Sequence, residues 1–256
     1  GIGGATSMAL AAEGASVIIM DPGSSKDGSG ANELNHAQET ADAINAKGGK
    51  VLGSVRPPLA TPDLSSFVLQ AQASKAKIVA FANAGTDTIN SIKAAKEFGI
   101  TKTMKIAGLL MFINDVHSLG LQTAEGLLMT DSWYWDMNDA TRKFANRYFM
   151  KMKKMPSSLQ AADYSAVSNY IKAVAAAGTD DPDKVIAQLK KMKIDDFYTK
   201  DTIRQDGRGI HDMYLLQVKT PAESKKPWDY MKAVATIPGD QAFATQAESK
   251  CALWKK

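Results

Sequence analysis

The chain contains few of the cysteine and histidine residues on which metal sites and many catalytic sites depend. It contains a single cysteine, Cys251, which excludes an internal disulfide and a metal site built from several cysteines. Its three histidines, His36, His117 and His211, lie far apart and show neither HxxxH nor HExxH spacing. We therefore predict no metal site. The sequence also contains no GxSxG nucleophile elbow and no Walker A lysine loop, so these hydrolase and nucleotidase classes are not expected.

Long apolar runs and blocks of one charge are also missing. No apolar run approaches the roughly 18 residues that a membrane-spanning helix needs. The net charge of +4 is small and its lysines alternate with acidic residues, so we expect no nucleic-acid surface. The first residues, Gly1-Ile2-Gly3, show neither a methionine start nor a signal peptide. The 256 residues, 45% of them hydrophobic and 23% charged, suffice for one large α/β domain or two smaller lobes.

One stretch, from Ala76 to Ile100, predicts a strand, a tight loop and a helix. Lys77 to Phe81 is a short apolar run typical of a buried parallel strand, and from Asp87 the apolar residues follow helical spacing as far as the stop signal at Gly99. In open α/β sheets ligands bind beyond the carboxyl ends of the strands. The loop from Asn83 to Thr86 is therefore a candidate ligand site, with a plain strand-to-helix connection as the alternative.

The rest of the chain alternates strands and helices in the same way. We predict strands at Ser16–Met20, Val51–Val55, Lys105–Met111, Gly126–Thr130 and Met213–Val218. We predict helices at His36–Lys47, Asp139–Lys153, Leu159–Ala177 and Asp183–Lys191, and an irregular tail from Pro221. This alternation indicates an α/β fold with Rossmann-like parallel sheets flanked by helices.

Several long stretches carry a specific resemblance. DLSSFVLQAQASKAK, AEGLLMTDSWYWD, IRQDGRGIHDMYLLQVK and PWDYMKAVATIPGD make residues 48–256 similar to type I periplasmic binding proteins of ABC importers, in the group that binds branched-chain amino acids and aromatic acids. The resemblance implies a solute-binding protein located in the periplasm, a small carboxylate or amino acid as ligand, and an importer permease as partner. It implies neither a cofactor nor an enzymatic activity.

The same resemblance implies a set of ligand-binding residues. The second lobe would contribute Asn83, Ala84 and Gly85 after one strand, and Leu109, Met111 and Phe112 after the next; the first lobe would contribute Leu159, Gln160 and Tyr164. Core packing is the alternative role for the apolar members. Leu109 falls near the position where amino-acid binders place an acid for the ammonium group. An apolar residue there favours a carboxylic acid without an α-amine over leucine itself.

The first 50 residues resemble a different family. Gly1-Ile2-Gly3, then AAEGA, then a strand that ends at Asp21, are similar to the first βαβ unit of short-chain dehydrogenases, in which Gly1, Ile2 and Gly3 would approach the pyrophosphate of NAD and Asp21 its ribose. These enzymes need a Tyr-x-x-x-Lys pair, and none of the seven tyrosines has a lysine four residues later. A dehydrogenase remnant, which would be cytoplasmic, is thus the weaker alternative.

Together the two resemblances predict a chimera joined near Gly48. Residues 1–50 form a dehydrogenase-like βαβ fragment, 51–133 a second-lobe-like segment, 134–194 a first-lobe-like helical segment, and 195–256 a return to the second lobe with a tail. The first lobe is therefore incomplete. Because its carboxylate-binding loops lie in the missing part, we expect impaired solute binding.

Overall fold

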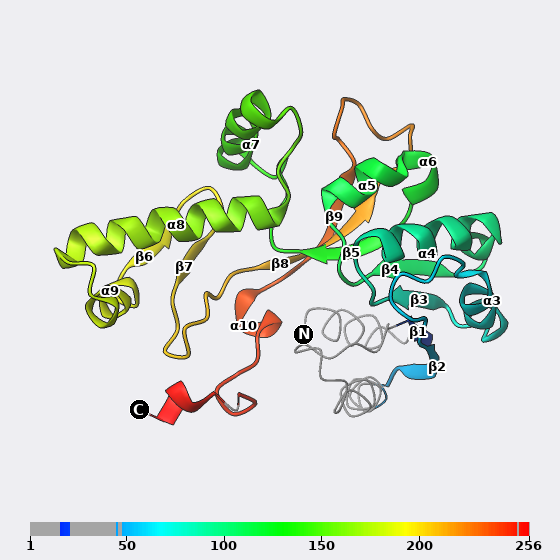
Figure 1. The fold of residues 1–256 in the computed structure, drawn as a ribbon, viewed down its shortest axis with the longest axis horizontal. Coiled ribbons are helices and arrows are strands. Elements are labelled where there is room, and N and C mark those ends of the chain that lie inside the picture. The colour runs from blue at the N-terminus through cyan, green and yellow to red at the C-terminus, as the bar shows by residue number, and fades with distance from the viewer. Residues whose placement is uncertain (1–15, 21–44, 46–47, 250, 256) are drawn as a thin grey trace. The chain divides into compact units, whose positions relative to one another are not determined.

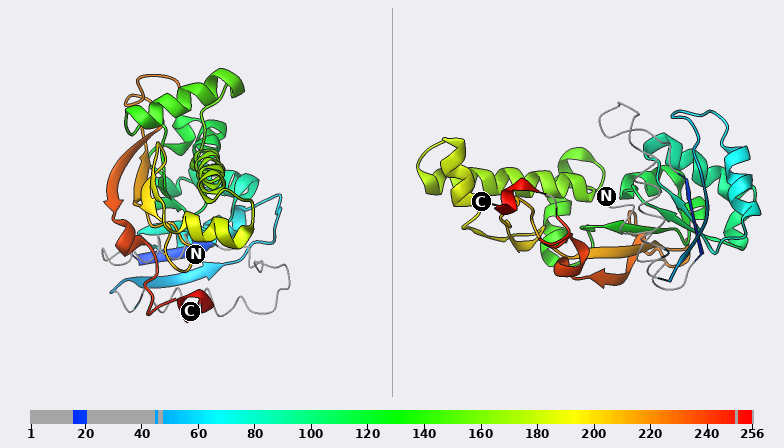
Figure 2. Two further views of the ribbon diagram at one scale, coloured as in Figure 1. Left: turned by 90° about the vertical axis from the view of Figure 1, so that its left-hand side faces the viewer. Right: turned by 90° about the horizontal axis from the view of Figure 1, so that it is seen from below.

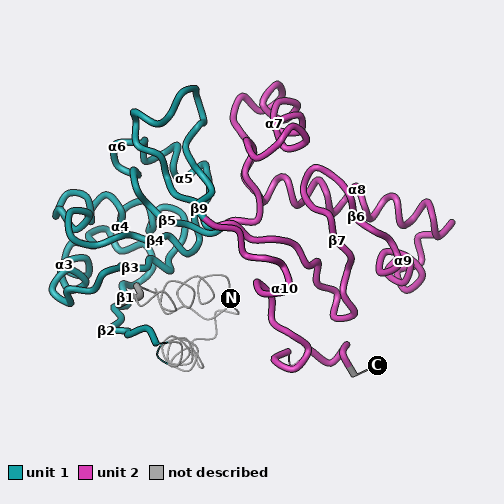
Figure 3. The backbone as a smooth tube through the Cα atoms, turned by 180° about the vertical axis from the view of Figure 1, so that it is seen from behind, with its two compact units in different colours: residues 1–130, 215–234 teal, residues 131–214, 235–256 magenta. Residues whose placement is uncertain are grey.

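A computed structural model describes residues 16–20, 45, 48–249 and 251–255. The chain folds as two compact units, coloured separately in Figure 3. Unit 1 comprises residues 1–130 and 215–234, and unit 2 comprises residues 131–214 and 235–256. The sequence-based segments, among them the return to the second lobe at residues 195–256, stay a prediction. The structure assigns residues 195–214 and 235–256 to unit 2.

Seven strands form one sheet in the order β2-β1-β3-β4-β5-β8-β9 (Figure 1). Four successive pairings in it are parallel: β1 with β2, β1 with β3, β3 with β4, and β4 with β5. The strands are β1 (Ser16–Met20), β2 (Lys50–Val55), β3 (Ile78–Phe81), β4 (Lys105–Gly108), β5 (Leu128–Asp131), β8 (Met213–Val218) and β9 (Met231–Ile237). The predicted parallel α/β fold is confirmed.

Strand β3 lies in the interior of the sheet, between β1 and β4. All four of its residues, Ile-Val-Ala-Phe, are buried, as expected for a strand that is covered on both faces. Its register aligns Ile78 with Lys105 and Phe81 with Gly108 of β4. One face of the sheet forms a core cluster of Ile78, Ala80, Ala107, Leu109 and Leu128.

The helices of unit 1 are α3 (Ser65–Ala73), α4 (Gly85–Glu97), α5 (Ile113–Leu119) and α6 (Leu121–Ala124), with a short 3-10 turn η1 (Ile100–Lys102) after α4. Helix α4 contacts α3, α5 and α6, and Figure 1 shows it between α3 and α5. Its buried face includes Ile92 and Ala95, three residues apart. The helix ends at Glu97, and Gly99 just beyond it has φ = 69°, a left-handed value that glycine adopts without a steric penalty.

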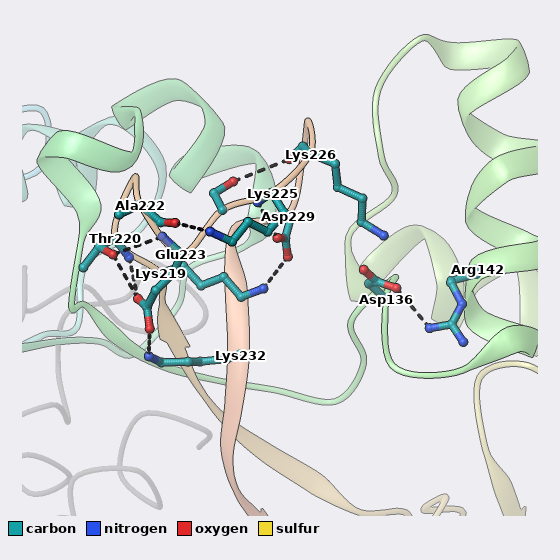
Figure 4. A network of polar contacts seen from close by, with 11 residues as sticks. Asp136, Arg142, Lys219, Thr220, Ala222, Glu223, Lys225, Lys226, Asp229 and Lys232 are labelled. Atoms are coloured by element: carbon teal, nitrogen blue, oxygen red, sulfur yellow. Dashed lines mark hydrogen bonds and ion pairs between the residues drawn. The ribbon is translucent and has the colours of Figure 1, made fainter.

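The loop between β8 and β9 is fixed by polar contacts within unit 1 (Figure 4). Asp229 is paired with the Lys219 ammonium and also accepts from the backbone N–H of Lys225 at 2.9 Å. Glu223 is paired with Lys232 and accepts from the backbone N–H of Thr220 at 2.8 Å. The ring of His117 stacks on Trp228 with centroids 4.0 Å apart. These contacts order a charged surface loop that lacks an apolar core of its own.

Unit 2 is dominated by helices. They are α7 (Asp139–Met152), α8 (Ser158–Ala177), α9 (Pro182–Leu189) and α10 (Gly239–Ala242), with a 3-10 turn η2 (Ala252–Lys255). An antiparallel pair, β6 (Lys193–Asp195) and β7 (Lys200–Thr202), completes the unit. Helix α8 runs as one continuous helix of 20 residues, as Figure 1 and the right-hand view of Figure 2 show. Its N-cap Ser157, like Asn138 before α7 and Asp181 before α9, accepts a backbone N–H of the first turn.

Two predicted elements differ from the structure. Strand β4 ends at Gly108 instead of Met111, because the Met111 side chain folds over Gly108: a Cβ on that glycine would lie 2.2 Å from the methionine sulfur. The tail predicted to be irregular contains β9 (Met231–Ile237), which is the outermost strand of the sheet. Most of the helix predicted at 36–47 lies outside the described residues.

Candidate functional site

The first candidate group lies at the carboxyl end of β3 and leads into α4. Asn83 is buried, and its amide is used within the protein: Nδ2 donates to Ser91 Oγ at 2.9 Å, and Oδ1 accepts from Thr88 Oγ1 at 3.0 Å. The side chain thus ties the loop to α4. Asn83 therefore has a structural role in this loop, while its role in binding a ligand stays a prediction.

The residues that follow are exposed. Ala84, Gly85 and Thr86 lie on the surface, and the N-cap position of α4 is Ala84, whose side chain cannot accept a hydrogen bond. Helix starts without a side-chain cap leave N–H groups free for an external acceptor, and the helix dipole favours a negative one. The start of this 13-residue helix can therefore hold a carboxylate.

The second candidate group follows β4, next to β3 in the sheet. The Leu109 N–H donates to the carbonyl oxygen of Phe81 at 2.9 Å, which brings the two strand ends together. The side chains of Leu109 and Met111, however, are buried, Leu109 in the core cluster and Met111 over Gly108. Leu110, which the sequence analysis did not select, is the exposed one at 42%. The preference for a carboxylic acid without an α-amine was based on Leu109 facing the ligand. Because Leu109 is buried in the core cluster, the structure does not support that preference.

Phe112 is partly buried and precedes α5. Its N–H donates to Asp115 Oδ2 at 2.8 Å, so this carboxylate caps the start of α5. Burial raises the pKa of Asp115, although the hydrogen bond from Phe112 acts in the opposite direction. The start of α5, unlike that of α4, is already occupied by an acid of the chain itself.

The third candidate group, in unit 2, lies on the first two turns of α8. Gln160 is used in capping, because its Oε1 accepts from the Ser157 N–H at 2.7 Å. Leu159 is exposed. Tyr164 is partly exposed; its hydroxyl accepts from Arg147 at 3.1 Å, and its ring packs against Phe144 with centroids 5.2 Å apart. Leu159 and Tyr164 thus remain accessible, whereas Gln160 has a structural role.

Unit 2 also contains a cavity of about 760 Å³ that the sequence analysis missed. Its volume is within the range of sites for small molecules. Aromatic and polar side chains from four stretches of the chain line it, among them Trp133, Thr141, Phe197, Tyr198, His211 and Tyr214. The aromatic run from Trp133 to Trp135 was a visible signal. The lining residues between 196 and 214 showed no such signal in the sequence, because only the folded chain brings them next to Trp133.

A polar network supports the wall of this cavity. Asp196 accepts from Ser165 Oγ at 2.7 Å and from Asn169 Nδ2 at 2.9 Å, both on α8. Burial acts to raise the pKa of Asp196, but these bonds and two backbone N–H bonds hold it below its usual value. Tyr198 donates to Ser132 Oγ at 2.9 Å, and its own pKa is raised by burial. The carboxylate therefore stays ionised and locks the loop after β6 to α8.

Asp131, at the end of β5, has a raised pKa, in contrast to the lowered pKa of Asp196. Burial raises its pKa to about 7, against hydrogen bonds from Ser158 and from the backbone of Ser132 and Trp133. The surroundings of Asp131 thus bring the pKa of its carboxyl close to neutrality. It titrates in the physiological range.

The predictions on metals and NAD concern different parts of the chain. Among the residues that the structure describes, no three histidine, cysteine or acidic side chains gather as metal ligands. In the same part of the chain, no helix has the length and apolar character needed to cross a bilayer. Gly1, Ile2, Gly3 and Asp21, the residues that the dehydrogenase resemblance assigns to NAD, lie outside the described residues.

Comparison with protein families gives a match over most of the chain. Residues 25–226 match the family model described as periplasmic binding protein. Residues 25–50, which belong to the segment that resembles dehydrogenases, are thus part of the match to the periplasmic binding protein family. A comparison with curated proteins finds no match.

Solved structures agree with the family. A periplasmic binding protein from Burkholderia mallei is 62% identical over 99% of this chain and 66% of its own, with a TM-score of 0.88. A branched-chain amino acid ABC transporter periplasmic ligand-binding protein from Burkholderia xenovorans is 41% identical over 98% of this chain and 67% of its own, with a TM-score of 0.85. An ABC transporter solute-binding protein from R. palustris, solved with 4-hydroxybenzoate, is 22% identical over 91% and 64%, with a TM-score of 0.74, and shows the fold alone. The chain thus spans about two thirds of the length of the proteins it matches.

Proposed function

We propose that this chain, which belongs to the periplasmic binding protein family, is the solute-binding component of an ABC importer. The observation that carries the proposal is the family match over residues 25–226, together with the 41% identity to the Burkholderia xenovorans ligand-binding protein. Location in the periplasm and an importer permease as partner belong to the same proposal. So does the absence of enzymatic activity, of a cofactor and of nucleic-acid binding.

The proposed ligands are branched-chain amino acids or aromatic carboxylic acids. Both classes carry a carboxylate, which is the group that the uncapped start of α4 at Ala84 and Gly85 can accept. The neighbouring strand end presents Leu110 to solvent, an apolar surface for the rest of the solute. Leu159 and Tyr164 are the accessible members proposed from unit 2.

We propose in addition that binding is weak. Asn83 and Gln160 use their amides within the protein, so backbone N–H groups carry most of the polar recognition. The chain spans about two thirds of the length of its relatives. Fewer contacts with one carboxylate mean a higher dissociation constant.

A thermal-shift titration tests the proposal. The purified chain is titrated with L-leucine, L-isoleucine, benzoate, 4-hydroxybenzoate and NAD⁺, with L-leucinamide and benzamide as matched controls that lack the carboxylate. A solute at ten times its dissociation constant stabilises the folded state by about 1.4 kcal/mol, so the melting temperature rises with concentration. We expect a rise with a carboxylate and none with its amide. Equal shifts with acid and amide would contradict the proposed α4 site.

The alternative function is a nucleotide-binding remnant of a dehydrogenase, joined to the binding protein near Gly48. The observation in its favour is that β1 lies between β2 and β3 with parallel pairing on both sides, an order shared by dinucleotide-binding units. In the same titration, a shift with NAD⁺ and with no carboxylate would select this alternative.

A further inference from the structure

Helix α7 and the turn after it carry positive charge that the surrounding residues do not balance. Residues 140–162 contain no aspartate or glutamate and six cations: Arg142, Lys143, Arg147, Lys151, Lys153 and Lys154. Arg142 is neutralised by Asp136 at 3.0 Å and by Asp139 at 2.6 Å. The other five cations are exposed, and none of them forms an ion pair with a described residue.

The unpaired charges lie on the outer side of the helix. Phe144 and Ala145 are buried, whereas Lys143, Arg147 and Lys151 follow one another at four-residue spacing and share an exposed side. Met150, which is 70% exposed, lies among them. The cationic face comprises Lys143, Arg147, Met150 and Lys151 of α7, with Lys153 and Lys154 directly after it.

The helix dipole explains only part of this pattern. Lys151 lies in the last turn of α7, where a cation favours the negative end of the helix. Lys143 lies in the second turn, where the dipole offers a cation no such gain. Arg147 donates to the Tyr164 hydroxyl at 3.1 Å and lies over the ring at 5.6 Å from its centroid, which orients the guanidinium without neutralising it.

A second lysine-rich stretch of unit 2 shows how an ordinary surface differs. Residues 179–196, which include α9 and β6, contain four lysines and five aspartates. Interspersed charges of both signs are typical of a solvated surface. The cationic face lacks such counter-charges, so its charge complements an anionic partner.

The geometry favours an extended partner over a small anion. The cavity of unit 2 takes only Asp139, Ala140 and Thr141 from α7, so the cationic face lies outside it. Anionic lipid surfaces bind clusters of about four to eight lysine and arginine side chains, and they accept an apolar side chain such as Met150 between the headgroups. We propose that the cationic face is a docking surface for a membrane of anionic phospholipid. The inference rests on the proposed location in the periplasm, which a membrane bounds.

Co-sedimentation with vesicles tests the proposal. The purified chain is mixed with vesicles of phosphatidylcholine, or with vesicles of equal parts phosphatidylcholine and phosphatidylglycerol, which is anionic. We expect the chain to bind the mixed vesicles only. Binding should be lost at about 1 M salt, which screens charges beyond roughly 3 Å.

A triple substitution removes half of the positive charge from this part of the chain. Lys143→Gln, Lys151→Gln and Lys154→Gln leave Arg147 and its contact with Tyr164 in place. Each cation near an anionic surface strengthens binding roughly fivefold, so the three substitutions should weaken binding about a hundredfold.

The matched control removes the same charge from the balanced stretch. Lys184→Gln, Lys191→Gln and Lys193→Gln replace exposed lysines there; α9 lies at the far end of α8 from α7 (Figure 1). This variant should weaken binding by less than about threefold, because charges remote from the lipid are screened. Met150→Ser retains every charge and should weaken binding about fivefold, because its apolar side chain no longer enters the headgroup layer.

Every other outcome overturns the proposal. Equal binding to both kinds of vesicle would make the contact apolar, and equal loss in both triple variants would reduce it to net charge. Binding of heparin without binding of vesicles would assign the face to a soluble polyanion, and binding of neither would leave it a solvated surface. Far-UV circular dichroism verifies that each variant is folded. The carboxylate-dependent thermal shift should persist in the α7 variant, so a failure here is distinct from a failure of the proposed solute site.

Discussion

The two units form helices by the same local rules and bury them to different extents. In unit 1, α4 buries Ile92 completely, beside a sheet in which all four residues of β3 are buried. In unit 2, α8 is longer and better capped, yet Ile171 is 61% exposed. Capping and spacing decide where a helix begins and which residues share a face. Whether that face is buried depends on a layer that the helix itself does not supply.

The comparison of Ile92 with Ile171 can be made with one substitution at two sites. Ile92→Ala removes a fully buried side chain and should lower the free energy of unfolding by about 2–5 kcal/mol. Ile171→Ala removes an exposed one and should change it by less than about 0.5 kcal/mol. Urea unfolding followed by far-UV circular dichroism measures both values. A loss above about 2 kcal/mol for Ile171→Ala would show that another part of the chain covers α8.

The second prediction concerns Asp131, whose pKa is raised from 3.8 to about 7 by burial. Between these two values the folded state holds a proton that the unfolded state has released. The free energy of unfolding therefore falls as pH rises from about 4 to about 7, by at most about 4 kcal/mol if this group acts alone. Raising the pH costs stability here, opposite to the usual behaviour of a paired carboxylate.

Asp131→Asn isolates this effect. The amide retains the size of the side chain and an oxygen that can accept from the Ser132 N–H, a bond of 2.8 Å in the structure, but it does not titrate. We expect the variant to be less dependent on pH between 4 and 7 and more stable than the parent at pH 8. The melting temperature measured at each pH provides the comparison. Parallel pH profiles for the two proteins would contradict the raised pKa of Asp131.

Much of the fold could be predicted because its signals are local. The apolar run of β3 and the helical spacing of α4 and α8 gave their bounds to within two residues. Strand β9 was missed because its residues are largely exposed and so lack the apolar alternation of a covered strand. The pairing of β6 with β7 was not predicted, because the sequence of either three-residue strand alone does not reveal its partner.

The candidate site was harder to predict, for a reason that Asn83 and Gln160 illustrate. An amide after a strand or at a helix start can bind a ligand or bond its own backbone and neighbours, and the sequence is the same in both cases. The structure shows that Asn83 bonds Thr88 and Ser91, and that Gln160 bonds the cap at Ser157. The cavity beside Trp133 shows the converse, since its lining comes from residues about 60 positions apart.

The third prediction compares two buried asparagines, one in each unit. Asn169 donates to the ionised Asp196, and charge-assisted hydrogen bonds contribute more than neutral ones, so Asn169→Ala should cost about 2–3 kcal/mol. Asn83 bonds two neutral hydroxyls, and Asn83→Ala should cost about 1–2 kcal/mol. Urea unfolding gives both values. Removal of the Asn169 donor should also raise the pKa of Asp196, and a smaller cost for Asn169→Ala than for Asn83→Ala would refute the ranking.

The smallest expected effect on stability is the most informative about function. The helix α8 begins with a serine cap, whereas α4 begins at Ala84, in an extended conformation with φ = −136° that suits a capping residue. Ala84→Asp should therefore stabilise the protein by about 0.5–1 kcal/mol, because its carboxylate accepts the free N–H groups of α4. The same carboxylate occupies the place proposed for the solute and repels it. A variant with a higher melting temperature and no carboxylate-dependent shift would place solute recognition at this helix start, whereas an unchanged shift would exclude it.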